Sequence, residues 1–333
     1  MSSKVSLTGI KPTVTIHLGN YLGAIRPALQ LMQNDEYKGY YFIADYHSLT
    51  TMHDPKLLKN SVYEVAASWL ACGLDPNKVV LYQQSHIPEI LEFYWIISCF
   101  TAKGHMNRAH AYKAMMAENS EHGRDPDQGI NMGIYSYPVL MAADILFLKS
   151  DVVPVGPDQL QHIEISREIA QAFNYVYGDV FKLPKALEQD VILIPGLDGR
   201  KMSKSYGNVL PLFCEEKKMQ KIINKIKTDS LPPEAAKDPD DSLIFDLYKY
   251  FATESEVNSL KQWYLKGIGW GEAKAELFKV INRELAQPRA RYFELMANTQ
   301  KIDDVLEDGA NQVRQKAQIF LKEVKKIIGL GRN

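Results

Sequence analysis

The sequence contains little cysteine, no excess of either charge, and no apolar run of membrane-spanning length. Its three cysteines, Cys72, Cys99 and Cys214, are an odd number at no metal-ligand spacing. A disulfide framework or a cysteine zinc site is therefore excluded as an organising element, and free thiols in a reducing cytoplasm are expected. The N-terminal residues lack the apolar core of a signal peptide. These absences predict a cytoplasmic protein without a membrane partner.

The charge balance limits which partners the whole surface can bind. The 333 residues include 39 Lys and Arg against 40 Asp and Glu, a formal net charge of −1. A surface for nucleic-acid phosphates must then be a local basic patch. The chain is 46% hydrophobic and shows no internal repeat, so it is an ordinary globular sequence, long enough for two domains.

Short apolar runs and helical patterns alternate along the first two thirds of the chain. Runs of β-type residues predict strands at residues 4–10, 40–47, 78–85, 151–159 and 191–195. Helical spacing of apolar residues predicts helices at residues 19–33, 55–71, 135–150 and 160–173. Such alternation is typical of βαβ units. It predicts the α/β class, with a Rossmann-like parallel sheet and helices on both of its faces.

The character of the chain changes beyond Gly207. The remaining residues are rich in Lys, Glu, Leu and Tyr at helical spacing, without a convincing strand. We therefore predict a catalytic domain over residues 1–207 and an all-α domain over residues 208–333. A mobile insertion is predicted at about residues 105–131, because Ala117–Asn131 is polar and contains two glycines and one proline.

A turn rich in hydrogen-bond donors follows the first predicted strand. Its sequence, TIHLGNYLGA (Thr15–Ala24), runs into a helix, whose start offers free backbone N–H groups and the positive end of a dipole. Gly19 permits an anion to approach the backbone, and His17 and Asn20 can donate hydrogen bonds. The arrangement is suited to a nucleotide phosphate, although the same residues also occur in ordinary turns.

A basic loop lies between Gly199 and Gly207. Arg200, Lys201 and Lys204 stand there among small and hydroxyl residues. Lysines are flexible point charges that can follow a moving phosphate, and the two glycines are candidate hinges for closure over ATP. A short basic run is more often a solvated loop, so this interpretation depends on companion motifs.

Three segments together resemble the motifs of class I aminoacyl-tRNA synthetases. HLGN at 17–20 is similar to the first motif of the family, KMSKS at 201–205 matches the second letter for letter, and GPDQ at 156–159 is similar to the turn after its fourth strand. Their order and spacing agree as well. The resemblance implies ATP with Mg²⁺ as a substrate, a tRNA partner for the helical half, and a homodimer.

The stretch Ser136–Leu148, SYPVLMAADILFL, predicts which amino acid is activated. On a helix, Tyr137, Met141 and Asp144 share one face. A buried aspartate requires a donor, and indole has one N–H donor, no acceptor and a flat apolar ring. Tyrosine enzymes of the family carry Gln at the position of Met141. The helix therefore resembles the tryptophan enzymes more closely.

Longer segments resemble the same branch. They are LMAADILFLKSDVVPVGPDQLQHIEISREIA, GNYLGA and the final IIGLGR. The resemblance implies a ligase that activates L-tryptophan with ATP and transfers it to tRNA(Trp). Three alternatives stay open: a tyrosine-specific relative, a regulatory protein that binds tryptophan or tRNA without ligation, and a nucleotidyltransferase with a similar first turn.

The resemblance also implies roles for individual residues. Those implied to act on the reacting phosphate are His17, Asn20, Lys201 and Lys204. Those implied to bind ATP are Lys11, Pro12, Thr13, Gly19, Asn20, Gly156, Pro157, Asp158, Leu193 or Ile194, Lys201, Met202, Ser203, Lys204 and Ser205. Those implied to bind tryptophan are Asp144, Tyr137, Met141, Gln159, Leu7, His47, Val153 and Val155. No dedicated metal site is expected, because Mg²⁺ would be held mostly by phosphates and water.

Some positions depart from the pattern of bacterial relatives. Those relatives commonly carry Gln at the position of Lys11 and Thr at that of His17, and some place a lysine shortly after Lys113. We therefore expect a divergent bacterial-type branch in which Lys11 or Lys113 supplies a cation to the phosphates.

Overall fold

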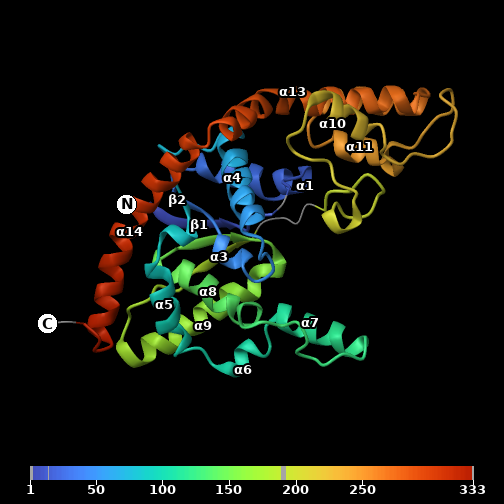
Figure 1. Cartoon of the computed structure of the whole chain (residues 1–333). Helices are drawn as coiled ribbons and strands as arrows, with labels where there is room; N and C mark the ends of the chain where they lie inside the picture. Colours follow the sequence, from blue (N-terminus) through green and yellow to red (C-terminus); the bar gives the residue numbers. More distant parts are fainter. Residues whose placement is uncertain (1–2, 14, 189–192, 332–333) are drawn as a thin grey trace.

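The computed structural model describes residues 3–13, 15–188 and 193–331. Its centre is a five-stranded parallel sheet in the order β3-β2-β1-β4-β5 (Figure 1). The strands are β1 Lys4–Ile10, β2 Tyr37–Ile43, β3 Val80–Gln83, β4 Val152–Val155 and β5 Lys185–Glu188. The chain adds β2 and β3 on one side of β1 and then β4 and β5 on the other. The strand order therefore reverses between β1 and β4, which is where open α/β sheets bind their ligands.

The helices fall into two groups along the chain. Those of the αβ half are α1 Leu18–Asn20, α2 Arg26–Met32, α3 Asp45–Ser48, α4 Pro55–Ala71, α5 Glu89–Ser98, α6 Lys103–Met106, α7 His110–Glu121, α8 Met132–Phe147 and α9 Leu160–Tyr177. Those of the helical half are α10 Glu216–Ile223, α11 Leu243–Tyr248, α12 Glu254–Lys266, α13 Trp270–Ala297 and α14 Gln300–Ile327. The described residues beyond 207 contain no strand of this sheet. The α/β prediction with a helical second half is confirmed.

The two faces of the sheet carry two hydrophobic cores. In β2, Tyr41 and Ile43 join the core with α1, α2 and α4, whereas Tyr40 and Phe42 join the core with α5, α8, α9 and α14. This division follows from the two-residue period of a strand, which sends alternate side chains to opposite faces. A strand between two helical layers is consequently apolar at every position, as the sequence YYFI is.

Most predicted strands and helices of the αβ half correspond to elements of the structure. β2 ends at Ile43 rather than near residue 47, because Asp45–Ser48 form α3. β5 was not predicted, since KALE is short and half charged, as edge strands often are. The last strand predicted, at residues 191–195, begins on residues that lie outside the described part of the chain.

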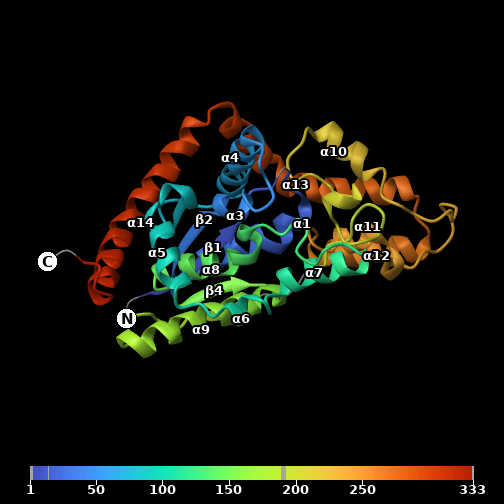
Figure 2. The same ribbon diagram turned by 60° about the horizontal axis from the view of Figure 1, so that its bottom comes forward.

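The expected loop at Ala117–Asn131 is wrong for its first residues, because α7 continues to Glu121. The buried side chain of Asn119 donates hydrogen bonds to the carbonyls of Pro126 (3.0 Å) and Gln128 (2.8 Å), which folds the following turns against the helix. Figures 1 and 2 show α7 projecting from the body of the αβ half.

The helical half shares its core with the αβ half. Leu210, Leu277 and Leu306 belong to the same buried cluster as Leu18 and Leu70. Arg26 of α2 also donates to Glu284 of α13 at 2.5 Å. The division at residue 207 stays a prediction, and apolar packing runs across it. Figure 1 shows α1 between the sheet and this half.

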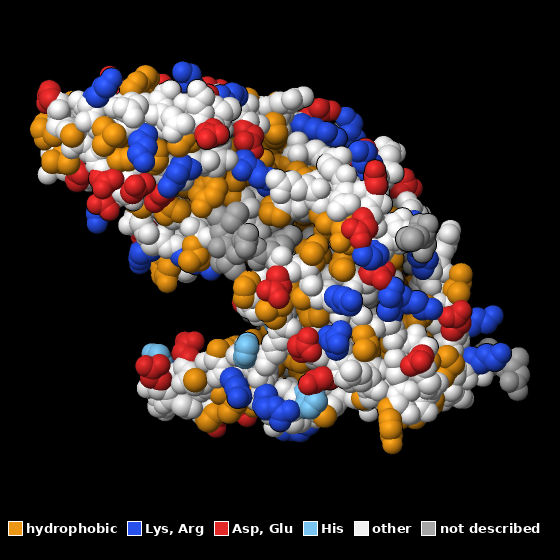
Figure 3. Space-filling model, turned by 180° about the vertical axis from the view of Figure 1, so that it is seen from behind, with side chains coloured by type: hydrophobic (Ala, Val, Ile, Leu, Met, Phe, Trp, Pro, Cys, Tyr) orange, Lys and Arg blue, Asp and Glu red, His pale blue; other side chains and the backbone are white. Residues whose placement is uncertain are grey.

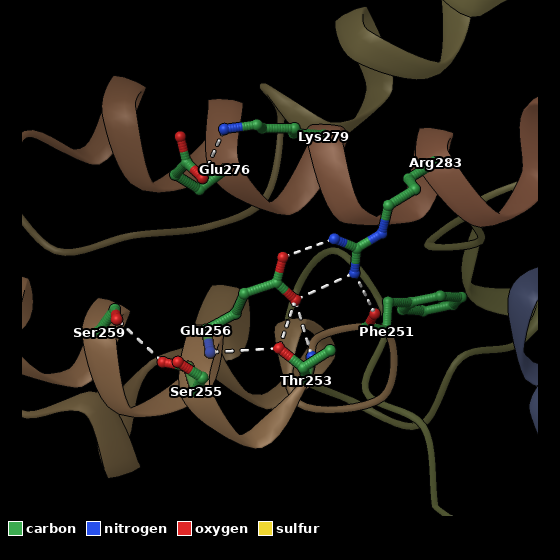
Figure 4. A network of polar contacts seen from close by, with 8 residues as sticks. All are labelled: Phe251, Thr253, Ser255, Glu256, Ser259, Glu276, Lys279 and Arg283. Carbon is green, nitrogen blue, oxygen red and sulfur yellow. Dashed lines mark hydrogen bonds and ion pairs between the residues drawn. The ribbon is translucent and has the colours of Figure 1, made fainter.

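A polar clamp holds α12 against α13 (Figure 4). Arg283 of α13 donates two hydrogen bonds to the Glu256 carboxylate, at 2.5 and 3.0 Å, and a third to the Phe251 carbonyl at 3.1 Å. Glu256 also accepts from the backbone N–H of Thr253 at 2.8 Å, as in a capping box at the start of α12. The Arg283 guanidinium and the Thr253 donors hold the pKa of Glu256 at about 2, so the clamp stays charged in mild acid.

Helix α14 returns from the helical half and packs against edge strand β3. A Cβ atom placed on Gly309 would lie 1.8 Å from the carbonyl oxygen of Leu81, so only glycine permits this approach. Salt bridges from Arg314 to Glu89 and from Lys325 to Glu92 join the rest of the helix to α5. Edge strand β3 is thereby covered. None of the helices in the described ranges is long and apolar enough to cross a membrane.

We expect Gly309→Ala to lower the free energy of unfolding by about 1–3 kcal/mol, since the new methyl group must push α14 away from β3. Helix propensity alone would predict a gain of up to about 1 kcal/mol. Urea unfolding followed by circular dichroism measures the change. The matched control is Gly271→Ala in α13, where a Cβ meets no atom within 4 Å; equal effects of the two substitutions would contradict the packing argument.

Candidate active site

The predicted tryptophan-binding carboxylate lies inside the αβ half. Asp144 on α8 is 0% exposed. His47 of α3 contacts its Oδ2 atom through Nε2 at 3.1 Å, and Gln84 donates from Nε2 to both Oδ1 and Oδ2 at 2.9 Å. An ionised carboxylate only accepts, so His47 Nε2 carries the proton in this pair. Burial raises the pKa of Asp144, and the hydrogen bonds from His47 and Gln84 act in the opposite direction.

Apolar side chains, here called the apolar wall, line the core on the face of the sheet to which α8 contributes. Leu7 of β1 and Val153 and Val155 of β4 are buried in the core of the same face, with exposed fractions of 1%, 5% and 6%. Met141, one turn before Asp144 on α8, is partly buried against that core. These predicted residues therefore belong to the core on one face of the sheet, which includes the adjacent strands β1 and β4.

A chain of hydrogen bonds connects three side chains near the end of β4. The Tyr137 hydroxyl lies 2.8 Å from Nε2 of His162, whose Nδ1 lies 2.8 Å from Oε1 of Gln159. Burial lowers the pKa of His162 to about 4, so its ring is neutral near pH 7. An amide oxygen can only accept, so Nδ1 donates to Gln159 and Nε2 accepts the hydroxyl proton of Tyr137. His162 was missed by sequence reasoning, although it stands three residues after Gln159 on α9.

The HLGN turn begins a helical run in which one turn is a π-helix, Tyr21–Ile25. Pro27 lies at the start of α2 and has no N–H to donate to the preceding turn, which accounts for the change of register. The Asn20 side chain accepts from the backbone N–H of His17 at 3.1 Å, so its Nδ2 is the group left for a ligand.

His17 is buried beside the basic loop. In the described structure its Nδ1 atom has no hydrogen-bond partner. Burial, and then the charge of Lys204, lowers the pKa of His17 to about 4. A Cβ atom on Gly19 would lie 3.1 Å from the His17 ring and so would crowd it. His17 is therefore a neutral hydrogen-bonding group rather than a cation.

One asparagine, Asn208, organises the KMSKS loop. Its Oδ1 accepts from the Ser203 N–H at 2.8 Å, and its Nδ2 donates to Asp198 Oδ1 at 2.6 Å and to the Lys201 carbonyl at 3.1 Å. A Cβ on Gly196 would lie 2.2 Å from this side chain. Asn208 and Asp198 were not among the predicted site residues, since their role depends on contacts across the loop.

The two lysines of the loop differ in environment. Lys201 is exposed, whereas the Nζ atom of Lys204 is buried and has no hydrogen-bond partner among the described residues. Burial lowers the pKa of Lys204, and the charge of Glu64 on α4 opposes that shift. Glu64 was not predicted. An unpaired, partly buried ammonium favours the arrival of an anion.

Other predicted ATP residues lie around these loops. Lys11 follows β1, and its Nζ donates to the Thr50 hydroxyl at 3.2 Å, while burial lowers its pKa. Lys113 is exposed on α7. Leu193 is 64% exposed and Ile194 only 3%, so Leu193 is the one free to contact a base.

The remaining predicted residues follow β1 or β4 or lie in the KMSKS loop. Buried or partly buried among them are Pro12, Thr13, Gly156, Met202 and Ser203, and exposed ones are Pro157, Asp158 and Ser205. The Asp158 carboxylate accepts from Gln159 Nε2 at 2.9 Å. The part of the chain with described coordinates contains no group of three or more His, Cys, Asp or Glu side chains that could hold a metal ion. Figure 3 shows the surface hollowed between the helical half and the arm that carries α7.

The sequence and the structure are similar to proteins of known activity. A family model described as tRNA synthetases class I (W and Y) matches residues 3–286. The tryptophan–tRNA ligase of Neisseria meningitidis serogroup A is 49% identical over 332 residues, which are 99% of each chain. That of Pseudomonas putida is 49% identical over 97% of this chain and 73% of its own. The crystal structure of tryptophanyl-tRNA synthetase from Campylobacter jejuni, complexed with ADP and tryptophan, has a TM-score of 0.89 at 38% identity, covering 98% of this chain and all of that one.

Proposed function

The chain belongs to the class I tRNA synthetases for tryptophan and tyrosine, and we propose that its site serves tryptophan. It is a tryptophan–tRNA ligase: it activates L-tryptophan with ATP to tryptophanyl-adenylate and pyrophosphate, and it then transfers tryptophan to tRNA. The observation that carries the choice of amino acid is the buried Asp144 carboxylate beside Met141, in an apolar wall. Likeness over the full length to tryptophan–tRNA ligases supports it.

Asp144 selects the indole ring by accepting its N–H. A phenol hydroxyl both donates and accepts, and next to Asp144 this face offers the thioether of Met141, which cannot donate to the phenol oxygen. The apolar wall of Leu7, Val153 and Val155 removes the flat ring from water, which contributes most of the affinity.

The polar end of the amino acid meets Tyr137 and Gln159. The Tyr137 hydroxyl donates a hydrogen bond to His162. The lone pairs of its oxygen therefore stay free to accept from the substrate ammonium group. Gln159 accepts from the same imidazole through Oε1. The neutral His162 thus orients both side chains without adding a charge that would repel the ammonium.

In the activation step a carboxylate oxygen of tryptophan attacks the α-phosphorus of ATP. A new phosphorus–oxygen bond forms, and the bond to the β-phosphate breaks, so that pyrophosphate leaves with both bonding electrons. No general base is required, because the attacking carboxylate is already ionised. Catalysis then consists of positioning the two substrates and stabilising charge on the phosphates.

The stabilising groups are those of the two motif loops and the end of β1. Lys204, Lys201 and Lys11 supply positive charge, and His17 and Asn20 donate neutral hydrogen bonds. Gly156 and Asp158 hold the ribose, and Leu193 packs on the adenine. Mg²⁺ would arrive with ATP, bound mostly by phosphate oxygens and water, and would neutralise part of the charge on the leaving pyrophosphate.

We propose that residues 208–333 form the tRNA-binding half, where the anticodon is read. Lys217, Lys218 and Lys221 on α10 are exposed and make a local basic patch. Two lysines of α14 are less available, because Lys316 donates to the Tyr40 hydroxyl and Lys325 is paired with Glu92. The proposal includes a homodimer, and it places ligation in the cytoplasm, where charged tRNA is used.

The purified protein is expected to exchange labelled pyrophosphate into ATP when tryptophan is present, and to attach tryptophan to tRNA(Trp). Tyrosine at the same concentration should support less than about one hundredth of the exchange, since Met141 leaves a phenol oxygen unpaired. Exchange with tyrosine instead would favour the tyrosine-specific alternative. Tryptophan binding without any exchange would favour the regulatory one.

Asp144→Ala should weaken the use of tryptophan by about 3 kcal/mol, or roughly a hundredfold in kcat/KM, because the indole N–H then lies buried without an acceptor. Pyrophosphate exchange measures the effect. Asp308→Ala, at an exposed position of α14, is the matched control. Normal tryptophan kinetics in Asp144→Ala would show that the pocket is wrongly assigned.

Lys204→Ala should slow adenylate formation by about a hundredfold or more, while tryptophan binding stays within roughly threefold of the unmodified protein. Single-turnover kinetics and equilibrium binding of tryptophan separate the two quantities. Lys261→Ala removes an exposed lysine of α12 and should change neither. A large loss of tryptophan affinity in Lys204→Ala would argue against its role on the phosphates.

A further inference from the structure

The two glutamines at the end of β3 hold two different carboxylates. Gln83 donates from Nε2 to Asp45 Oδ2 at 2.7 Å, whereas Gln84, the next residue, donates from Nε2 to both oxygens of Asp144 at 2.9 Å. Consecutive residues at a strand end point in opposite directions, which separates the two contacts. Gln84 begins a 3-10 turn, Gln84–His86, and is 0% exposed.

The contacts on Asp144 are unequal. Oδ2 accepts from both His47 and Gln84, whereas Oδ1 accepts only from Gln84. A carboxylate has about four lone-pair sites, two on each oxygen. Oδ1 therefore retains an acceptor site in the described structure. The contact of Gln84 with both oxygens sets the orientation of the carboxylate, and with it the direction in which Oδ1 points.

The other end of the Gln84 amide argues against a purely structural role. Its Oε1 atom is buried and has no hydrogen-bond partner in the described structure. An unpaired buried carbonyl costs free energy, and an apolar side chain such as methionine would fill the same space without that cost. What the glutamine supplies, and methionine would not, is the pair of donor contacts to Asp144.

We propose that Gln84 is a positioning residue for amino-acid specificity: it orients the Asp144 carboxylate so that Oδ1 is presented to the indole N–H of tryptophan. The inference rests on the proposed function and deepens it. Gln84 does not touch the substrate in this account. It acts through Asp144, and His47 contributes to the same orientation through its contact with Oδ2.

The charged and titratable groups that face Asp144 determine how the proposal responds to pH. They are His47 and Asp45 on α3 and Tyr82 on β3. The donors oppose the effect of burial on the Asp144 pKa, whereas the negative charge of Asp45 adds to it. Removing the Gln84 donors should therefore raise the pKa of Asp144 further, so that its acceptor form is lost as the pH falls.

The test compares Gln84→Met with Gln84→Glu in pyrophosphate exchange between pH 6 and pH 8. At pH 8 both variants should raise the KM for tryptophan about tenfold or more, with the KM for ATP and kcat within roughly threefold of the unmodified protein. As the pH falls, the KM for tryptophan of Gln84→Met should rise relative to that of the unmodified protein, because a further raised pKa favours protonation of Asp144. The KM for tryptophan of Gln84→Glu should instead fall toward that of the unmodified protein as the pH falls. The carboxyl group introduced by that substitution, once protonated, can again donate to Asp144.

The KM for tryptophan, taken relative to that of the unmodified protein, should change with pH in opposite directions in the two variants. A loss of packing alone would not produce this difference. Gln83→Met is the matched control, since Gln83 holds Asp45, and it should leave the KM for tryptophan within about threefold. Circular dichroism establishes that each variant is folded. The role of Gln84 would be overturned if the KM for tryptophan changed equally with pH in the two Gln84 variants. It would also be overturned if their KM values for tryptophan and ATP rose together.

These outcomes stay distinct from failure of the proposed function. If the unmodified protein shows no tryptophan-dependent exchange, the proposed function is wrong. If it does, and folded Gln84 variants keep its KM for tryptophan, only the inference about Gln84 is wrong.

Discussion

The constraint on which the site depends is the burial of one carboxylate, Asp144, in an apolar wall. Removing an acceptor from water is costly unless donors replace the lost hydration. Those donors come from two elements besides α8: His47 stands on α3 after β2, and Gln84 stands after β3. Satisfying the carboxylate thus ties together the ends of two neighbouring strands and the helix that crosses them.

The region proposed to bind phosphates differs in that its buried charge has no hydrogen-bond partner in the described part of the chain. There the ammonium of Lys204 is buried without a partner among the described residues, and the neighbouring His17 is kept neutral by burial and by that same charge. An ammonium without a hydrogen-bond partner is the kind of group that would gain from the arrival of an anion, as the proposed phosphate role requires. A chain of nearly zero net charge can in this way carry strong local fields of both signs.

The helical half packs on the αβ half through apolar side chains. Its core continues into that of α1 and α4, and α14 returns to cover β3. Strand β3 leads directly to Gln84. The helical half therefore packs on the same short strand whose end supplies a donor to the Asp144 carboxylate.

Local patterns in the sequence determined β1, α4 and the motifs that identify the chemistry, because strand alternation, helical periodicity and motif spacing involve residues close together along the chain. The resemblance of those motifs to a known family indicated the class of reaction, whereas the role of Asp144 stays a prediction. The donors to Asp144, the imidazole of His162 and the loop contacts of Asn208 could not be derived at that level, since each depends on a partner from another element or on how a loop folds back. Only the tertiary structure decides such pairs, because burial creates the need for a partner and the folded arrangement determines which side chain is near enough to meet it.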